Sequence, residues 1–345
     1  LSFQSIKLVN HFNRASRLAN GRHLIIETVS SYGERNGVMQ LVSYRIHGHA
    51  DESWRAGVED EGRVVDVAAL WHDGANQTTT RQLLTAGPAT VRKVFTQARE
   101  SLDAGSDAPG VFRAATVELG PPVPDPDKII CIGINYADHA SEAGLARTEV
   151  PLFFAKFRNS LTGPTSPILL PRVSSQIDYE GELAVIMGMR CKEVSEQEAL
   201  QYVAGYSIMN DVSARDLQMQ TSQYIAGKAL DTFAPMGPGI VLASDIPNPQ
   251  TLQLTTRVNG QVVQHARTAT MIFSVAAIIS FLSSLMTLEP GDIIATGTPS
   301  GVGFKRTPPL FLCEGDITEV EIEGIGQLRN PVVDTRTEAG AAREK

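Results

Sequence analysis

Hydrophobic and polar positions alternate in a strand-like way near the start of the chain. Residues 40–46 (Gln-Leu-Val-Ser-Tyr-Arg-Ile) and 63–67 (Arg-Val-Val-Asp-Val) each predict a β-strand. Residues 76–103 predict a helical segment from the spacing of their apolar residues Leu83, Leu84, Val91, Val94 and Phe95. A connector rich in Gly and Pro over residues 119–126 then marks a boundary. We therefore predict a small N-terminal α+β domain over residues 39–120.

Short apolar runs separated by turns dominate the chain after this connector. The runs that predict strands are residues 128–134, 182–187, 239–242 and 291–296. Residues 252–264 predict a β-hairpin, because two alternating runs flank the dipeptide Asn259-Gly260. The pattern favours one larger domain over residues 124–333.

Two segments within this domain have helical spacing. Residues 195–202 begin with Ser195, followed by Glu196 and Glu198, which is typical of a capped helix start. Residues 270–286 place a core-packing stripe on one face, formed by Met271, Val275, Ile279, Leu282 and Leu285. Residues 334–345 are polar and predict a flexible tail. The fold class is therefore expected to be mixed α/β and mostly β.

Residues 1–38 differ in composition from the rest of the chain. They hold five Lys or Arg residues against two Glu residues, and they are rich in Ser, Asn and His. A basic, acid-poor segment of this kind is typical of a mitochondrial transit peptide. The alternative is an upstream extension without a function, with Met39 as the true start. The expected location is mitochondrial in the first case and cytoplasmic in the second.

Composition excludes several classes of protein. Hydrophobic residues make up 42% and charged residues 20% of the 345 positions, which excludes a disordered or fibrous chain. The net charge is −8 and no Lys/Arg-rich run occurs, so nucleic acid is not expected as a partner. The apolar run at residues 275–279, which Ser280 interrupts, is too short for a membrane span. Three scattered cysteines form neither a disulfide framework nor a zinc site.

Candidate chemistry begins with two carboxylates in one predicted strand. In Asp178-Tyr-Glu-Gly-Glu182, residues i and i+2 of a strand project to the same face, so Glu180 and Glu182 lie side by side. Adjacent carboxylates repel unless a cation or a shared proton joins them. A pair of oxygen ligands suits Mg²⁺, Mn²⁺ or Ca²⁺ and does not suit zinc. The alternative is a solvated strand face.

A second polar cluster follows the apolar run that ends at residue 209. Asp211 is a candidate third carboxylate, Arg215 a candidate clamp for a substrate carboxylate, and Gln218 a candidate donor to an oxo group. The alternative is a helix start in which Asp211 caps the helix and Asp216 pairs with Arg215.

Three further segments carry candidate chemistry. His139 and Glu142 are three residues apart, so on a helix they share a face and can hold a water and take its proton. A surface ion pair explains that spacing equally well. Lys228 lies among apolar residues and is an anion anchor, a proton carrier with a lowered pKa, or a side chain that reaches solvent. Residues 296–303 form a Gly- and Thr-rich loop that can bind a carboxylate but lacks a phosphate-loop motif.

Together, five segments resemble the fumarylacetoacetate hydrolase superfamily, in the family's own order. They are 133–139 (Gly-Ile-Asn-Tyr-Ala-Asp-His), 178–182, 210–218, 227–233 (Gly-Lys-Ala-Leu-Asp-Thr-Phe) and 296–303 (Thr-Gly-Thr-Pro-Ser-Gly-Val-Gly). The resemblance is strong over residues 124–333 and weaker over 39–119. It implies a catalytic domain with a rolled, mixed β-structure, a homodimer, and a bound Mg²⁺ or Mn²⁺ ion.

The resemblance also implies a role for each matching residue. It implies metal ligands at Glu180, Glu182 and Asp211. It implies a water-activating dyad on a mobile lid at His139 and Glu142, and an active-site lysine at Lys228. It implies substrate contacts at Arg215, Gln218 and Thr298. Thr232 matches a hydroxyl that some members place near the metal shell.

Within the superfamily, residues 305–316 and the region from Gln40 look most like the branch of oxaloacetate tautomerases. The expected substrate is a small 2-oxo acid or 1,3-dicarbonyl compound, which reacts through an enolate bound to the metal. Oxaloacetate keto–enol tautomerisation is the leading hypothesis. Acylpyruvate-type C–C hydrolysis and oxaloacetate decarboxylation, in central metabolism or a dedicated pathway, are the alternatives. A non-catalytic protein that binds a small acid or a metal is a further alternative.

Overall fold

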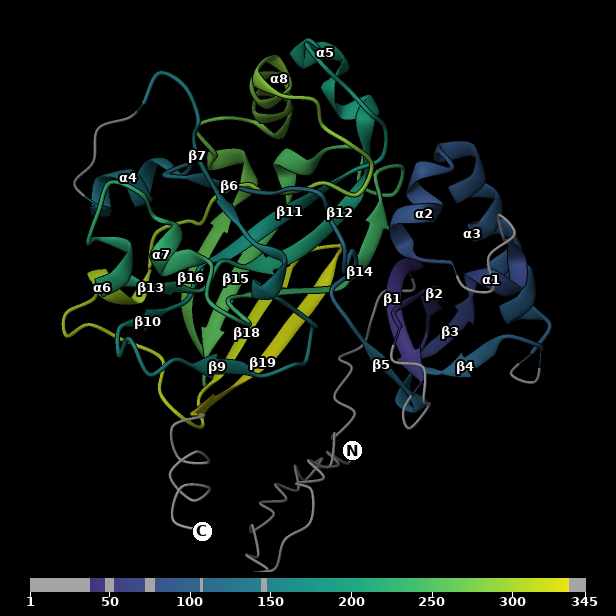
Figure 1. Cartoon of the computed structure of the whole chain (residues 1–345), viewed down its shortest axis with the longest axis horizontal. Helices are drawn as coiled ribbons and strands as arrows, with labels where there is room; N and C mark the ends of the chain where they lie inside the picture. The colour runs from purple at the N-terminus through teal and green to yellow at the C-terminus, as the bar shows by residue number, and fades with distance from the viewer. Residues whose placement is uncertain (1–37, 47–52, 72–77, 106–107, 144–147, 335–345) are drawn as a thin grey trace, which may run out of the picture. The chain divides into compact units, whose positions relative to one another are not determined.

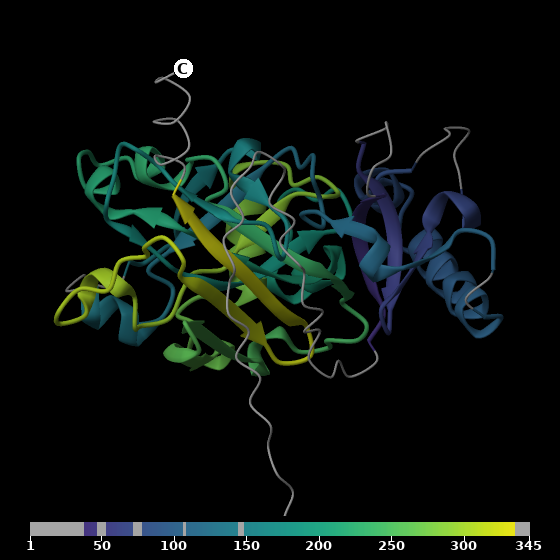
Figure 2. The same cartoon turned by 90° about the horizontal axis from the view of Figure 1, so that it is seen from below.

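The computed structural model describes residues 38–46, 53–71, 78–105, 108–143 and 148–334 (Figures 1 and 2). The predicted presequence-like segment, apart from Val38, and the predicted tail beyond Asp334 lie outside the described residues. Strands outnumber helices and form no closed barrel, which confirms the prediction of a mixed, mostly β fold. Within the described residues, no helix has both the length and the apolar character needed to span a membrane.

One sheet of twelve strands runs through most of the described chain. Ten of its strands follow the order β4-β3-β2-β1-β14-β12-β11-β17-β6-β7, while β5 pairs with β1 and β8 pairs with β14. The bounds are β1 Gln40–Ile46, β2 Arg55–Asp60, β3 Arg63–Asp66, β4 Val111–Arg113, β5 Val117–Leu119, β6 Ile129–Gly133, β7 Leu152–Lys156, β8 Leu161–Thr162, β11 Gly181–Met187, β12 Val203–Asn210, β14 Ala234–Leu242 and β17 Ile293–Ala295.

A second sheet of five strands has the order β16-β15-β18-β19-β9, and β10 and β13 form a separate pair. The bounds are β9 Ile168–Leu170, β10 Ile177–Asp178, β13 Ser213–Ala214, β15 Gln253–Val258, β16 Gln261–Arg267, β18 Ile317–Ile322 and β19 Gly326–Asp334. The strands β15 and β16 confirm the predicted hairpin, with Asn259 and Gly260 at positive φ in its turn. Figure 1 shows the long strands β18 and β19, in yellow, near the C-terminal end of the colour scale.

The helices are short apart from two. Their bounds are α1 Val67–Leu70, α2 Thr80–Thr85, α3 Pro88–Asp103, α4 Ala137–Ala143, α5 Glu196–Ala199, α6 Arg215–Gln218, α7 Ile225–Lys228 and α8 Val275–Leu285. The short helices α4, α6 and α7 themselves carry candidate residues, which are His139 and Glu142, Arg215 and Gln218, and Lys228, respectively. They therefore place polar side chains beside strand ends, where loops and short turns display functional groups.

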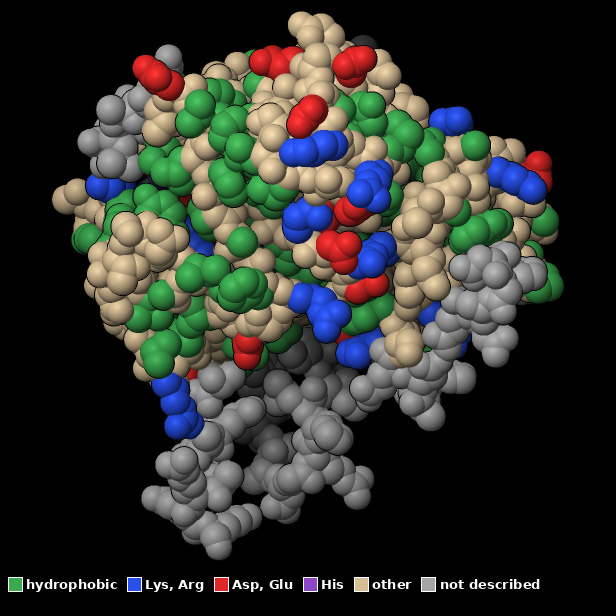
Figure 3. All heavy atoms as spheres, turned by 45° about the horizontal axis from the view of Figure 1, so that its top comes forward, with side chains coloured by type: hydrophobic (Ala, Val, Ile, Leu, Met, Phe, Trp, Pro, Cys, Tyr) green, Lys and Arg blue, Asp and Glu red, His purple; other side chains and the backbone are tan. Residues whose placement is uncertain are grey.

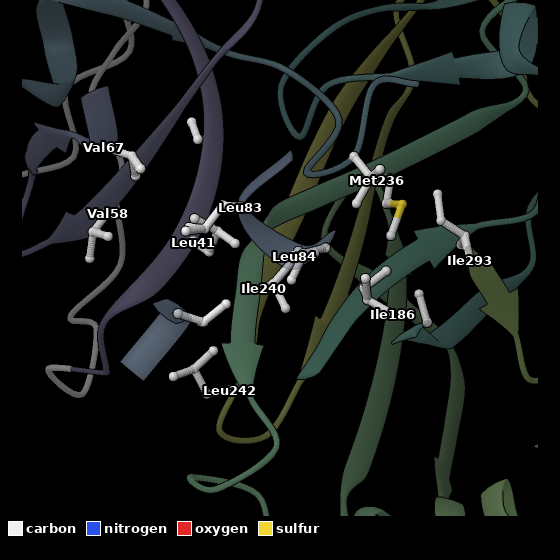
Figure 4. Close-up of a cluster of buried hydrophobic side chains, with 14 of the residues drawn as sticks. Leu41, Val58, Val67, Leu83, Leu84, Ile186, Met236, Ile240, Leu242 and Ile293 are labelled. Carbon is white, nitrogen blue, oxygen red and sulfur yellow. The ribbon is translucent and has the colours of Figure 1, made fainter. Parts of the chain in front are cut away.

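Strand β11 is the centre of the packing, because both of its faces are buried. Leu183 and Val185 belong to the hydrophobic cluster shared with the five-stranded sheet. Ala184 and Ile186 point the other way, into the cluster that includes Met236 of β14 and reaches β1 (Figure 4). The alternation predicted for this strand is therefore present, but neither face is solvated. A carboxylate on such a strand must find its partners inside the protein.

Three local predictions differ from the structure in detail. The predicted helix over 76–103 is two helices, because Gly87 has a φ of 91° and Pro88 begins α3, where its missing N–H is harmless. The predicted strand 63–67 ends at Asp66, whose side chain accepts the Ala68 N–H and caps α1. Ser195 occupies the predicted cap position, but its hydroxyl donates to Glu198 instead of capping the backbone.

The predicted helix over 270–286 begins later than its pattern suggested. Ser274 is its N-cap and accepts the Ala277 N–H, so α8 starts at Val275. Val275, Ile279 and Leu282 are buried as predicted, whereas Leu285 is 53% exposed. The stripe therefore packs over most of its length and ends before the last turn.

Candidate active site

Three carboxylates predicted as metal ligands meet in the interior. Glu180, Glu182 and Asp211 each offer one oxygen, and the three oxygens all lie within 4.8 Å of one another. The antiparallel register of β11 and β12 places Gly181 opposite Asn210, so the residue before β11 lies beside the residue after β12. The Asp211 amide accordingly donates to the Glu180 carbonyl at 2.8 Å. The burial of all three excludes the alternative of a solvated strand face.

Lys228 lies between two of these carboxylates. Its Nζ is 2.6 Å from Glu180 Oε2 and 2.7 Å from Asp211 Oδ2. Burial alone would lower the pKa of Lys228, but the charges of Asp211 and Glu180 outweigh it and raise the pKa above its usual value. The charges of Asp211 and Glu180 therefore favour the ammonium form of Lys228, which supports an anion anchor over a proton carrier with a lowered pKa.

Arg215 bridges Glu180 and a fourth carboxylate. Its Nη2 lies 2.6 Å from Glu180 Oε1, its Nε donates to Asp178 Oδ2 at 2.9 Å, and its Nη1 donates to Gln218 Oε1 at 2.9 Å. Asp216 instead accepts a hydrogen bond from Ser174. The alternative in which Asp216 pairs with Arg215 is therefore wrong. Burial opposes ionisation of Glu180, yet Arg215 and Lys228 lower its pKa to about 2.

A second buried lysine, absent from the sequence-based site, completes the cluster. Lys156 at the end of β7 donates to Asp211 Oδ1 at 2.6 Å and to the Val212 carbonyl at 3.1 Å. Burial lowers the pKa of Lys156, and Asp211 opposes that effect. A lysine that ends the run Leu-Phe-Phe-Ala-Lys is the same signal that singled out Lys228, so the sequence contained the clue.

Glu182 is the carboxylate that this arrangement leaves without a counter-charge. The Gly297 amide donates to its Oε2 at 2.7 Å, and the described residues contain no ion pair to it. Burial raises the pKa of Glu182 well above its usual value, and the neighbouring charges of Asp211 and Glu180 raise it further. Four buried carboxylates thus face three buried cations, counting Asp178 with the predicted ligands.

The cluster fits a hard divalent cation by its donor set. Its ligand atoms are carboxylate oxygens, which Mg²⁺ and Mn²⁺ prefer. Among the three, Glu182 is the carboxyl group without a cation partner in the described part of the chain, and a bound cation would supply one. Glu180, Glu182 and Asp211 are the residues that would hold such an ion.

The predicted dyad is present on α4. His139 Nδ1 lies 3.4 Å from Glu142 Oε2, as expected for residues three apart on a helix. The Glu142 carboxylate also accepts from the Gly301 amide, at 3.1 and 3.2 Å. His139 is only 7% exposed, so the alternative of a surface ion pair does not describe it. The dyad is therefore tied to the loop 296–303.

A cavity of about 120 Å³ joins the cluster to the dyad. Seven of the ten predicted site residues line it, namely His139, Glu180, Glu182, Arg215, Gln218, Lys228 and Thr298. Apolar and aromatic side chains that sequence reasoning missed form much of the remaining wall, among them Phe154, Tyr224 and Phe304. The volume is well below the roughly 300–1,000 Å³ of sites for drug-sized ligands. The cavity therefore suits a small molecule.

The remaining predicted residues have other surroundings. Asp211 and Glu142 contact the lining residues Lys228 and His139 without lining the cavity themselves. Thr298 lines the cavity, but its hydroxyl already donates to the Gly181 carbonyl and accepts from Gln264. Thr232 does not line it, and its hydroxyl accepts the Leu169 amide instead. The roles of these residues stay predictions.

The isosteric changes Glu180→Gln and Glu182→Gln should affect the free energy of unfolding differently. In chelator-treated protein at neutral pH, we expect Glu180→Gln to lower the free energy of unfolding by about 3–5 kcal/mol, because two buried cations lose a counter-charge. We expect Glu182→Gln to leave it unchanged or to raise it, since the fold disfavours the ionised form of this carboxyl. Urea unfolding measures both, and equal destabilisation by the two changes would contradict this charge balance.

The same two carboxylates should make the free energy of unfolding depend on pH in opposite directions. The pKa of Glu180 is lowered, so its stabilising contribution is complete above its unfolded pKa of about 4.3 and disappears as pH falls towards about 2. The pKa of Glu182 is raised, so Glu182 increasingly destabilises the metal-free protein as pH rises above about 4.3. Urea titrations between about pH 5 and 8 should show Glu182→Gln gaining stability over the wild type. If the difference in the free energy of unfolding between Glu182→Gln and the wild type stayed constant across this pH range, the raised pKa of Glu182 would be refuted.

Comparisons with known proteins place the chain in a family. The family model described as fumarylacetoacetate (FAA) hydrolase, C-terminal, matches residues 128–333. "Oxaloacetate tautomerase fahd2, mitochondrial" of Xenopus laevis is 37% identical over 297 residues, which are 86% of this chain and 90% of the relative. "Oxaloacetate tautomerase FAHD2A, mitochondrial" of Homo sapiens is 38% identical over 297 residues, 86% of this chain and 92% of the relative.

A solved structure extends the likeness to the fold. Fumarylacetoacetate hydrolase from the psychrophile Exiguobacterium antarcticum has a TM-score of 0.72 and 38% identity, over 86% of this chain and 99% of its own. The resemblance inferred from the five segments is thereby confirmed. The chain belongs to the fumarylacetoacetate hydrolase family.

Proposed function

We propose that this protein is a divalent-metal-dependent enzyme that interconverts the keto and enol forms of oxaloacetate. The observation that supports it most is the buried carboxyl group of Glu182, which has no cation partner among the described residues and lies on the wall of a small cavity. Relatives that share about 38% identity over most of the chain bear the name oxaloacetate tautomerase. The site and these names agree, because oxaloacetate is a small acid with adjacent oxygen donors.

Mg²⁺ or Mn²⁺ is the cofactor we propose, held by Glu180, Glu182 and Asp211. When bound, such an ion supplies Lewis-acid stabilisation for the negative charge that develops on a 2-oxo oxygen as C3 loses its proton. The chain's own residues then keep the ligands in place: Lys228 and Lys156 each contact one oxygen of Asp211. Both oxygens of Asp211 are thus fixed before substrate arrives.

Arg215 and Gln218 are the substrate-orienting groups we propose. Arg215 is buried and held by Asp178 and Glu180, so its guanidinium has a fixed direction at the cavity wall. The Gln218 carbonyl accepts from Arg215, which leaves its amide nitrogen for an oxygen of the substrate. Such fixed donors limit the poses that a 2-oxo acid can adopt.

His139 is the residue we propose for moving the proton at C3. Lys228 is held as an ammonium by Asp211 and Glu180, so it is unsuited to accept a proton. The Nδ1 of His139 faces Glu142, which favours a proton on Nδ1 and leaves Nε2 to exchange one with the substrate. The imidazole lines the cavity, where the substrate would bind.

Hydrolysis of a C–C bond is the second candidate, and the His139–Glu142 pair favours it. A water held by this pair would be activated by loss of its proton to the imidazole. The similar bacterial structure named a fumarylacetoacetate hydrolase gives this candidate a precedent in the family. The two functions share all other parts of the site, and oxaloacetate decarboxylation shares them as well.

Assembly and location complete the proposal. We propose a homodimer, because the edge strand β7 and the residue that follows it expose aromatic side chains, Phe153 at 38% and Phe157 at 55%. Figure 3 shows a face where hydrophobic side chains gather to the left of a central group of mixed Lys, Arg, Asp and Glu side chains. A mitochondrial location is proposed from the relatives' names and the basic composition of residues 1–38.

The metal dependence is tested with freshly dissolved enol-oxaloacetate at neutral pH. Its ultraviolet absorbance should fall fast with protein and Mn²⁺ or Mg²⁺, without formation of pyruvate, and at the uncatalysed rate with chelator. Glu182→Gln should lower the metal-dependent rate by more than about 100-fold, since even residues that merely orient metal ligands cost 10–100-fold. Loss of enol matched by pyruvate would establish decarboxylation, and a Glu182→Gln protein with full activity would exclude the metal site.

His139→Ala tests the proton-transfer role. We expect the rate of enol loss at saturating Mn²⁺ to fall by about 10²–10⁴-fold, the usual contribution of a positioned acid or base. Calorimetric titration with Mn²⁺ should show unchanged affinity, because His139 is not among the ligands. His265→Ala, on the exposed side of β16, is the matched control and should retain the wild-type rate. If His139→Ala retained its activity, proton transfer at C3 would have to be carried out by another group.

A further inference from the structure

One loop donates a backbone amide to each half of the site. The Gly297 amide donates to Glu182 Oε2 at 2.7 Å. Four residues later, the Gly301 amide donates to both carboxylate oxygens of Glu142, at 3.1 and 3.2 Å. Glu142 Oε2 in turn lies 3.4 Å from His139 Nδ1. The position of Gly301 therefore determines where the Glu142 carboxylate lies behind the imidazole.

Two side chains hold Gly301 from its carbonyl side. The Tyr179 hydroxyl donates to the Gly301 carbonyl at 3.0 Å. Arg306 Nε donates to the same carbonyl at 3.2 Å and to the Tyr179 hydroxyl at 3.1 Å. Arg306 Nη2 also donates to the Val263 carbonyl of β16 at 2.6 Å. Arg306 therefore joins Gly301 to the neighbouring strand, and Tyr179 supports the same point.

The backbone at Gly301 is closely confined. Gly301 has a φ of 102°, and a Cβ at this position would overlap the Val263 carbonyl oxygen, so the position requires glycine. Tyr179 is fully buried in a hydrophobic cluster, which fixes the direction of its hydroxyl. Tyr179, Arg306 and Gly301 do not line the cavity. Any effect of these residues on the chemistry must therefore pass through Glu142.

The other end of the loop has a separate anchor. Gln264 Nε2 donates to the Thr298 hydroxyl at 2.8 Å and to the Pro299 carbonyl at 2.9 Å. The Thr298 hydroxyl donates to the Gly181 carbonyl of β11 at 3.0 Å. These bonds fix the end of the loop that serves Glu182, and they involve neither of the side chains that hold the other end.

We propose that Tyr179 and Arg306 are positioning residues for proton transfer, which hold the Gly301 amide where it fixes the Glu142 carboxylate behind His139. The inference rests on the proposed function, in which His139 moves the proton at C3. A fixed Glu142 keeps a proton on Nδ1 of His139 and leaves Nε2 for the substrate. Since a small displacement of a catalytic group is costly in rate, support at this distance from the substrate matters for turnover.

Tyr179→Phe tests the proposal, because it removes one hydroxyl and keeps the buried ring. With freshly dissolved enol-oxaloacetate and saturating Mn²⁺, we expect kcat to fall about five- to ten-fold, the effect of losing one hydrogen bond. KM should stay as in the wild type, because the anchor at Thr298 is intact. Calorimetric titration should show unchanged Mn²⁺ affinity, although Tyr179 directly precedes Glu180. Arg306→Met, the second variant, should lower kcat in the same way. Tyr206→Phe, a buried tyrosine of β12, is the matched control and should keep the wild-type kcat.

Hydrogen exchange, followed by mass spectrometry, tests the positioning without an assay of activity. Tyr179→Phe should speed the exchange of backbone amides in α4, because Glu142 holds that helix against the Gly301 amide. In Glu142→Ala this contact is already lost, so adding Tyr179→Phe should not speed the exchange of α4 further. A merely structural role of the Tyr179 hydroxyl would instead make the effects of the two changes additive.

The outcomes separate this proposal from the proposed function. A Tyr179→Phe protein with the wild-type kcat, a change in its KM or Mn²⁺ affinity that accounts for the whole loss, or additive effects on the exchange of α4 would each overturn the positioning role. A wild-type protein that does not accelerate the loss of enol-oxaloacetate would overturn the proposed function. The exchange of α4 would then still show whether Tyr179 positions Glu142.

Discussion

The charge balance beneath the cavity is the constraint on which the rest of the site depends. Four carboxyl groups lie in the interior with three cations, and Glu182 is the one that has no cation partner among the described residues. Buried ions are tolerated only with close partners and well-placed hydrogen bonds. The two lysines and the arginine satisfy this for the other three carboxylates. A cation bound at Glu182 would complete the balance, and the same cation would supply the chemistry.

Strand β11 explains how the chain reaches this arrangement. Both faces of β11 are packed in hydrophobic clusters, so its register relative to β12 is strongly fixed. That register determines that Glu180 and Asp211 meet, because they lie just outside the paired ends. The apolar packing thus positions the charged groups, although hydrophobic burial alone would have favoured an apolar residue at Glu182.

Local patterns predicted most strands, because the period of two is a property of the chain alone. The E-x-E spacing made Glu180 and Glu182 candidate ligands, and the polar segment after residue 209 added Asp211, but the resemblance to a family was needed to favour these roles over their alternatives. The helix break at Gly87–Pro88 could also have been predicted from these two residues, but the apolar stripe that continues across them concealed it. The role of Lys156 depended on a contact across a long separation. Lys156 lies 55 residues from Asp211, its partner. The direction of the Lys228 pKa shift likewise required both neighbouring carboxylates to be in place.

The central claim is that Glu182, the carboxyl group without a cation partner among the described residues, holds a divalent ion together with Glu180 and Asp211. The most direct measurement is a crystal structure of the protein soaked in Mn²⁺, with anomalous scattering used to locate the metal. The account predicts a single strong peak within about 2.5 Å of carboxylate oxygens from Glu180, Glu182 and Asp211. A fully occupied peak elsewhere, or no peak while these three side chains remain ordered around Lys228, would contradict it.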